Sequence, residues 1–231
     1  MSALRFSPVL FDLDGTLVDS GRDIAASVNR TLEAMDLAPL PEEDIIGFVG
    51  DGVRRTLRRA LACAGRPEAE DEAVRAFKDD YRRHCAVHTR PYLGVMDLLG
   101  RLDPDRVGVV TNKMAGLAAD VLEAVGLAPL VGAVVGGDET ARIKPDPAPL
   151  LLACERLGMS LAGGIMVGDH ENDIEAARTA GMASCGVLWG FDAGASVRAG
   201  RPDFVCATVG DLYRVLLGPP DPGAPPSVSC R

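Results

Sequence analysis

The sequence lacks any apolar run of the roughly 18 to 20 residues that a membrane-spanning helix requires. It also lacks the CxxC pairs that are typical of zinc and redox sites, since its six cysteines lie singly in apolar or helical stretches. No long apolar segment precedes a cleavage site of small residues near the N-terminus, as a secretory signal would require. We therefore expect a cytoplasmic protein with reduced cysteines and no membrane association.

Positive charge is scarce as well. The chain has 24 Lys and Arg residues against 33 Asp and Glu, and its net charge is -9. This balance argues against a nucleic-acid-binding protein. A Walker loop is also missing, because the glycine-rich residues 47–52 do not end in Gly-Lys-Ser/Thr.

The most informative stretch is DLDGTL at residues 12–17, which follows an apolar run typical of a buried strand. Side chains two apart in an extended chain point to the same side, so Asp12 and Asp14 can lie close together. Two carboxylates that close repel each other unless a cation lies between them or one holds a proton. The pair indicates a hard-metal site, two coupled acid and base groups, or both. An EF-hand loop is excluded, because Gly15 comes fourth rather than sixth.

Two patterns divide the rest of the chain. Residues of about 20 to 86 are helical in their periodicity, and Ser20 and Asp23 have the spacing of a capping box. From residue 106 to 188, buried-type strands alternate with helices, which indicates a parallel sheet covered on both faces. Residues 218–231 are rich in Pro and Gly, so we expect them to be disordered.

Polar residues stand at the ends of several predicted strands, where an open parallel sheet binds its ligands. Besides the two aspartates of the DLDGTL stretch, they are Thr111, Asn112, Asp169 and Asp173. Lys144 lies between these groups in the sequence. Carboxylates, a hydroxyl, an amide and an ammonium are the groups that Mg²⁺-dependent phosphoryl transfer requires.

These residues form four motifs along the chain: Asp12 to Leu17, the strand that ends in Thr111 and Asn112, Lys144 before Pro145, and Gly168 and Asp169 with Asp173. In this order, the motifs resemble those of the haloacid dehalogenase superfamily, in the phosphatase branch that carries a small helical cap. The resemblance extends over nearly the whole chain to about Leu217. It implies an α/β fold with a Rossmann-like, doubly wound parallel-sheet core. The core would comprise residues 1–19 and 87–217, the inserted α-helical cap residues 20–86, and the tail residues 218–231.

The resemblance also implies a role for each motif residue and Mg²⁺ as cofactor. Asp12 would be the nucleophile, Asp14 the general acid and base, and Lys144 the cation that neutralises the phosphoryl group. The residues implied to hold Mg²⁺ are Asp12, Asp14, Asp169 and Asp173. Thr111 and Asn112 would bind the phosphoryl oxygens.

The cap loop is the part that indicates a substrate. Residues 47–52 resemble the cap loop of phosphoglycolate phosphatases, so the expected substrate is 2-phosphoglycolate, a small phosphorylated metabolite. The residues expected to contact it are Gly50, Gly52, Arg54 and Arg55, the arginines as forks on a carboxylate or else as solvated surface residues. His170 departs from the family pattern, where a small hydroxyl residue is commoner, and we expect it to face solvent.

Other functions stay open at this point. A related phosphatase or mutase would keep the same core and act on pyrophosphate, a nucleotide or a sugar phosphate. A dehalogenase is disfavoured because its chemistry needs no acid for the leaving group, and Asp14 is present. The alternative from another functional class is a regulatory protein that binds a phosphoester without hydrolysing it. We expect the protein to be a monomer or a homodimer.

Overall fold

A computed structural model describes residues 4–218, which form a six-stranded parallel sheet with helices around it. The strand order is β5-β4-β1-β6-β7-β8, and every neighbouring pair is parallel. The strands are β1 (Val9–Phe11), β4 (Val107–Val110), β5 (Ala133–Val135), β6 (Ile165–Gly168), β7 (Ala183–Val187) and β8 (Phe204–Cys206). The predicted parallel α/β sheet is confirmed, and β8 adds an edge strand that the sequence patterns did not reveal. The expected disordered tail lies outside the described residues, apart from Gly218.

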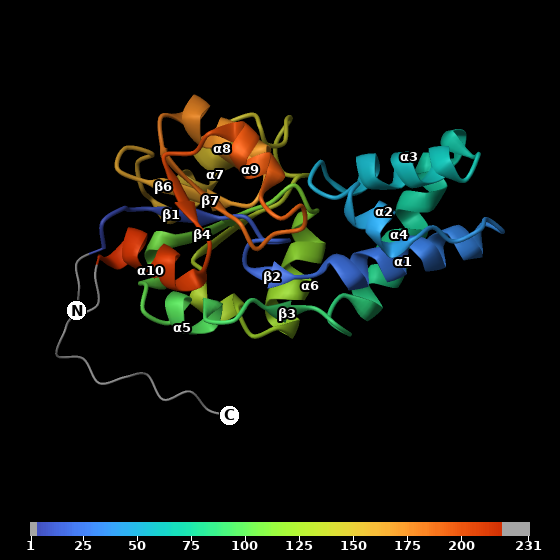
Figure 1. The fold of residues 1–231 in the computed structure, drawn as a ribbon, viewed down its shortest axis with the longest axis horizontal. Helices are drawn as coiled ribbons and strands as arrows, with labels where there is room; N and C mark the ends of the chain where they lie inside the picture. The colour runs from blue at the N-terminus through green and yellow to red at the C-terminus, as the bar shows by residue number, and fades with distance from the viewer. Residues whose placement is uncertain (1–3, 219–231) are drawn as a thin grey trace.

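Helices cover both faces of this sheet, as a doubly wound core requires (Figure 1). Alternate side chains of β1 point to opposite faces of the sheet. Val9 and Phe11 therefore pack into one hydrophobic cluster and Leu10 into another. The first cluster includes residues of α5 (Val95–Leu99), α6 (Ala115–Ala124) and α10 (Val209–Leu217). The second includes residues of α7 (Ala148–Leu157) and α8 (Glu171–Ala180), and α9 (Ala195–Gly200) packs against α8. Short 3₁₀ turns occur at Pro67–Ala69, Pro104–Arg106 and Ala128–Leu130.

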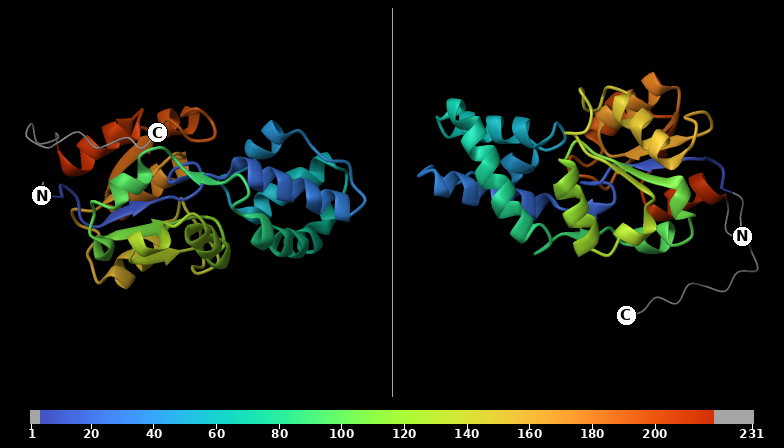
Figure 2. Two further views of the ribbon diagram at one scale, coloured as in Figure 1. Left: turned by 90° about the horizontal axis from the view of Figure 1, so that it is seen from below. Right: turned by 180° about the vertical axis from the view of Figure 1, so that it is seen from behind.

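Four further helices form a separate lobe beyond the carboxyl ends of the strands (Figure 2). They are α1 (Gly21–Ala34), α2 (Glu42–Ile46), α3 (Val53–Cys63) and α4 (Glu70–His84), and all fall within the segment 20–86. Apolar side chains at helical spacing, such as Ile24, Val28 and Leu32 of α1, are buried where α1 packs against α4. No helix among residues 4–218 combines the length and apolarity needed to cross a membrane.

The lobe joins the core through two antiparallel strands, β2 (Val18–Asp19) and β3 (Arg90–Pro91). Asp23 is buried beside them and accepts hydrogen bonds from the backbone N–H groups of His88 and Thr89 at 2.8 Å each. The predicted capping box of Ser20 and Asp23 is therefore wrong. The Asp23 carboxylate binds the backbone of the returning chain, and the Ser20 hydroxyl donates to Asp14 and accepts no hydrogen bond from the first turn of α1.

Candidate active site

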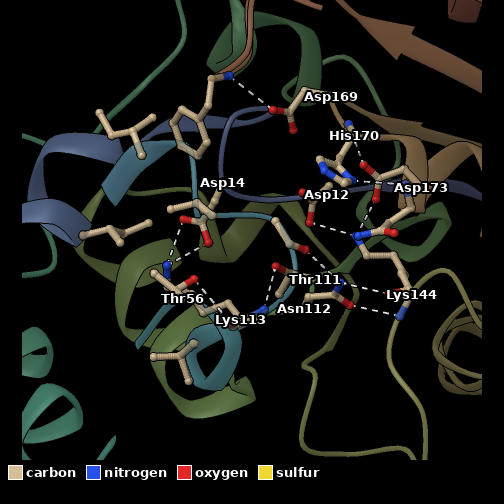
Figure 3. A pocket seen from close by; sticks show the side chains of 18 of the residues that line it. Asp12, Asp14, Thr56, Thr111, Asn112, Lys113, Lys144, Asp169, His170 and Asp173 are labelled. Carbon is tan, nitrogen blue, oxygen red and sulfur yellow. Dashed lines mark hydrogen bonds and ion pairs between the residues drawn. The ribbon is translucent and has the colours of Figure 1, made fainter. Parts of the chain in front are cut away.

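A pocket opens between the carboxyl ends of the strands and the helical lobe (Figure 3). The core contributes most of the sequence-predicted residues: Asp12, Asp14, Thr111, Asn112, Lys144, Asp169 and Asp173. The cap loop contributes Gly50 and Gly52. Residues far apart in the sequence meet here because β1, β4 and β6 are neighbours in a parallel sheet and end at the same edge.

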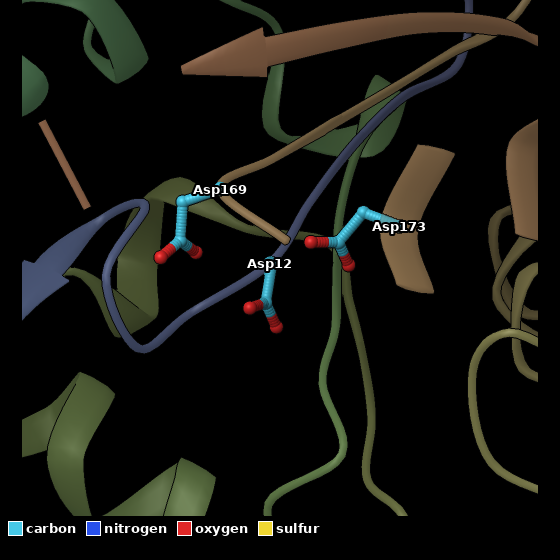
Figure 4. A group of neighbouring side chains, drawn as sticks. All are labelled: Asp12, Asp169 and Asp173. Atoms are coloured by element: carbon cyan, nitrogen blue, oxygen red, sulfur yellow. The ribbon is translucent and has the colours of Figure 1, made fainter. Parts of the chain in front are cut away.

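Three carboxylates lie close together in this pocket (Figure 4). Asp12 follows β1, Asp169 follows β6, and Asp173 lies in the first turn of α8. One oxygen of each lies within 4.8 Å of the other two. Such a concentration of negative charge in a buried place is unfavourable unless cations compensate for it.

The pKa values of two of these carboxyl groups are raised. Burial raises the pKa of Asp12 to about 6, helped by the charges of Asp173 and Asp14 and opposed by Lys144. Burial also raises the pKa of Asp169 well above its ordinary value, and the charges of Asp12 and Asp173 act in the same direction. A raised pKa means that the folded protein disfavours the ionised carboxylate, so this cluster is suited to receive a cation.

Lys144 is the cation that the fold itself supplies. Its Nζ donates to Asp12 at 2.9 Å, to Asp173 at 2.6 Å and to the carbonyl oxygen of Val110 at 2.5 Å. Burial lowers the pKa of Lys144, but the two carboxylates outweigh it and raise the pKa above its ordinary value. The side chain therefore stays charged although it is 2% exposed.

Asn112 holds the loop that carries this lysine. Its amide accepts a hydrogen bond from the backbone N–H of Lys144 at 3.0 Å and donates to the carbonyl oxygen of Lys144 at 3.1 Å. The same amide nitrogen lies 3.0 Å from the carbonyl oxygen of Gly50 in the cap loop. Asn112 is thus engaged by backbone groups of the core and of the cap.

Asp14 has two partners that the sequence analysis missed. Lys113 Nζ donates to both carboxylate oxygens, at 2.8 and 2.7 Å, and the Ser20 hydroxyl donates to one of them at 2.5 Å. Lys113 directly follows Thr111 and Asn112, so it is the third polar residue after a buried strand. That position was a usable signal, since ligands gather at such strand ends.

Small residues and backbone groups keep Asp169 in place. Its two oxygens accept from the Thr16 hydroxyl at 2.9 Å and from the N–H of Phe191 at 3.4 Å. A Cβ at either Gly15 or Gly190 would overlap the carboxylate, and Gly15 also has a positive φ of 84°. Only glycine allows the two chain segments to approach this closely.

Arg54 and Arg55 are not brought into the pocket, because α3 is amphipathic and they lie on its outer face. Its buried residues include Thr56 and Leu57, whereas the arginine side chains are 59% and 58% exposed. Arg54 pairs with Glu70 and Asp71 of α4 rather than with a group in the pocket. The alternative of a solvated surface describes both arginines.

His170, which was expected to face solvent, is half-buried and lines the pocket. Its Nδ1 accepts from the N–H of Asn172 at 3.2 Å, which makes it the N-cap of α8 and leaves the proton of a neutral ring on Nε2. A Cβ at Gly50 would lie 3.2 Å from that Nε2, so the imidazole packs against the cap loop. Asn172 also donates to Asp51 of this loop at 3.1 Å.

The donor set fits Mg²⁺. The cluster of Asp12, Asp169 and Asp173 offers only oxygen ligands, which hard cations prefer. Five carboxylates line the pocket, those of Asp12, Asp14, Asp169, Asp173 and Asp192, together with the ammonium groups of Lys113 and Lys144. Three negative charges remain when all seven groups are ionised, and a divalent cation would offset most of that excess.

Comparisons with known proteins show which family the chain is similar to. The family model of the haloacid dehalogenase-like hydrolases matches residues 9–187. The phosphoglycolate phosphatase of Neisseria meningitidis serogroup A is 38% identical over 90% of this chain and 92% of that protein. The phosphoglycolate phosphatase of Chromobacterium violaceum is 37% identical over 94% of this chain and 99% of that protein. A crystal structure described as a predicted phosphoglycolate phosphatase from Haemophilus somnus is similar with a TM-score of 0.84 and 30% identity, over 91% of this chain and 98% of that one.

Proposed function

The chain belongs to the haloacid dehalogenase-like hydrolase family, and on that premise we propose that it is a Mg²⁺-dependent phosphatase of small phosphomonoesters. One observation carries the proposal. Asp12 stands at the end of the central strand within reach of a buried ammonium, in a carboxylate cluster, with Asp14 two residues further on. This arrangement provides a nucleophile, its electrostatic partner and a separate acid and base.

In the first step, a carboxylate oxygen of Asp12 attacks the phosphorus of the ester. A bond forms between that oxygen and phosphorus, the bond from phosphorus to the alcohol oxygen breaks, and the alcohol oxygen takes a proton from Asp14. Lys144 lies 2.9 Å from Asp12 and stabilises the negative charge on the phosphoryl group during the transfer. Thr111 and the backbone around Asn112, which line the pocket at the end of β4, would bind the phosphoryl oxygens.

In the second step, water attacks the phosphorus of the phosphorylated Asp12. Asp14 now takes the proton of that water, and the bond between phosphorus and the Asp12 oxygen breaks to release phosphate and restore the carboxylate. One residue thus serves as acid and then as base. The residues that would hold Mg²⁺ are Asp12, Asp169 and Asp173, whose carboxylates form the cluster. The resemblance to the family adds the backbone carbonyl of Asp14. When bound, the cation would lower the repulsion between these carboxylates and the phosphate.

The first substrate that we propose is 2-phosphoglycolate, which is supported by the names of the relatives and by their coverage of the chain. We further propose a reducing, cytoplasmic setting, in which Cys185 and Cys206, whose Sγ atoms lie 3.5 Å apart, stay as thiols.

A second candidate substrate is a phosphomonoester with a larger, uncharged alcohol part, such as a sugar phosphate. The lack of an unpaired cation in the pocket lining favours an uncharged alcohol part. The cap side presents the apolar side chains of Ile24, Ile46, Val49, Val53 and Phe77. Among residues 4–218, the lysines and arginines in the lining are Lys113 and Lys144, and both are already bound to carboxylates. A carboxylate on the substrate would therefore meet no free ammonium or guanidinium group there.

Phosphate release tests the proposal. The wild-type protein is assayed with 2-phosphoglycolate, a hexose 6-phosphate, a nucleoside monophosphate, pyrophosphate and 4-nitrophenyl phosphate, with Mg²⁺ and with EDTA. We expect turnover that needs Mg²⁺ and that Asp12→Asn abolishes, since an amide does not attack phosphorus. Asp71→Asn is the matched control, because this aspartate is 73% exposed on the cap. No turnover of any ester by folded protein with Mg²⁺ would favour a protein that binds phosphoesters without hydrolysing them.

A further inference from the structure

Lys113 has no role in the proposed steps, yet it is buried in the pocket. We propose that Lys113 is a positioning residue for Asp14, and that Tyr81 of the cap helix α4 holds the lysine in place. This inference rests on the proposed function, since it concerns the residue that protonates the leaving group.

The contacts of Lys113 point to Asp14 and not to the nucleophile. Its Nζ lies 2.8 and 2.7 Å from the two oxygens of Asp14, so the ammonium binds both oxygens of the carboxylate. The side chains of the pair are 8% and 11% exposed, so little water competes for these bonds. Lys144 already serves Asp12 and Asp173. The site therefore has one cation for the nucleophile and another for the acid.

Both ends of Lys113 are fixed. At the backbone, its N–H donates to the Thr111 hydroxyl at 3.2 Å, and its carbonyl oxygen accepts from the N–H of Gly137 at 2.8 Å. At the other end, Nζ lies 4.6 Å from the ring centre of Tyr81, a cation–π contact. Tyr81 is fully buried and stacks on Phe77 with ring centres 5.2 Å apart. The position of the ammonium thus depends on the core and on the cap.

Proper placement of an acid matters most for an ester whose leaving group is a poor one. A phenol that is already acidic departs without a proton, whereas a weakly acidic alcohol requires it. If Lys113 positions Asp14, its loss lowers kcat/KM more as the pKa of the leaving group rises. If Lys113 only binds the phosphate or supports the fold, its loss lowers kcat/KM equally for all esters, because each carries the same phosphate.

The experiment measures kcat/KM for substituted phenyl phosphates whose phenols range from strongly to weakly acidic. This constant reports only the steps up to departure of the phenol, so the hydrolysis of phosphorylated Asp12 does not enter. For Lys113→Met we expect a steeper fall with leaving-group pKa than in wild type, with a loss of about 10²-fold on the weakest phenol and a few-fold on the strongest. Lys113→Arg retains a donor for both oxygens and should return the slope toward that of wild type. Lys78→Met is the matched control, since this lysine of α4 does not line the pocket.

Two cap variants keep the test decisive if Lys113→Met does not fold. Tyr81→Leu removes the ring and should steepen the slope, whereas Tyr81→Phe keeps the ring and the wild-type slope. A uniform loss across all phenols, or no loss, in the folded Lys113→Met protein would overturn the inference, as would equal slopes in the two Tyr81 variants. Absence of turnover in the wild-type protein would instead refute the proposed function.

Discussion

The raised pKa of Asp12 predicts an unusual pH dependence of stability in the metal-free protein. Asp12 has an ordinary pKa of 3.8, and burial raises it to about 6 in the folded protein. The folded protein therefore holds this proton more tightly than the unfolded chain does. The contribution to stability is fully present below pH 3.8 and is lost as the pH rises through 6, the reverse of a carboxylate whose pKa is lowered on folding.

The size of the effect follows from the shift. A rise from 3.8 to about 6 corresponds to about 3 kcal/mol of differential stability. Asp12→Asn removes the titration while its side-chain oxygen still faces the ammonium of Lys144. We expect the free energy of unfolding of Asp12→Asn, minus that of wild type, to increase by about 3 kcal/mol between pH 3.5 and pH 8 without metal.

Urea unfolding in EDTA, followed by circular dichroism at several pH values, measures this difference. Asp71→Asn serves as the control, since its side chain is exposed, and its difference from wild type should vary little with pH. Added Mg²⁺ should stabilise wild type most above pH 6 and progressively less below it, because protons and the cation compete for the same oxygens. A difference that is flat, or that falls as the pH rises, would refute the reasoning that Asp12 is electrostatically strained.

Three other changes test particular contacts. Lys144→Met should abolish turnover and lower the free energy of unfolding by about 3–5 kcal/mol, since it leaves buried carboxylates unpaired; urea unfolding as in wild type would contradict this. Gly190→Ala should weaken Mg²⁺ binding measured by calorimetry, because the added Cβ would overlap the Asp169 carboxylate. Gly116→Ala is the control and should bind Mg²⁺ as wild type does, because only an arginine side chain lies near that position. Arg54→Ala should leave kcat/KM within about twofold of wild type, because exposed pairs contribute little; a tenfold loss would place the arginine at the substrate.

The sheet and the carboxylates at its edge were predictable from local patterns. Buried apolar runs that end in Asp12, Thr111 and Asp169 predict the strands and the polar groups at their ends. A parallel sheet brings these strand ends together at one edge. Lys144 follows no strand directly, and the resemblance to known motifs was needed to place it in the site.

What escaped prediction depends on where side chains point in three dimensions. Ser20 and Asp23 have the spacing of a capping box, but other partners, Asp14 and the backbone at Thr89, bind them instead. Arg54 was a candidate by its position after the glycine loop, yet the amphipathic pattern of its helix directs it outward. The position of Lys113 after a strand indicates that it reaches the site, but no local pattern indicates that it pairs with Asp14, which follows a different strand.

The most direct test of the account is phosphate release from 4-nitrophenyl phosphate by wild type and by Asp12→Asn, each with Mg²⁺ and with EDTA. We expect turnover by wild type with Mg²⁺ and none in the other three samples. Turnover by folded Asp12→Asn that matches wild type would contradict the assignment of the nucleophile, on which the proposed mechanism depends.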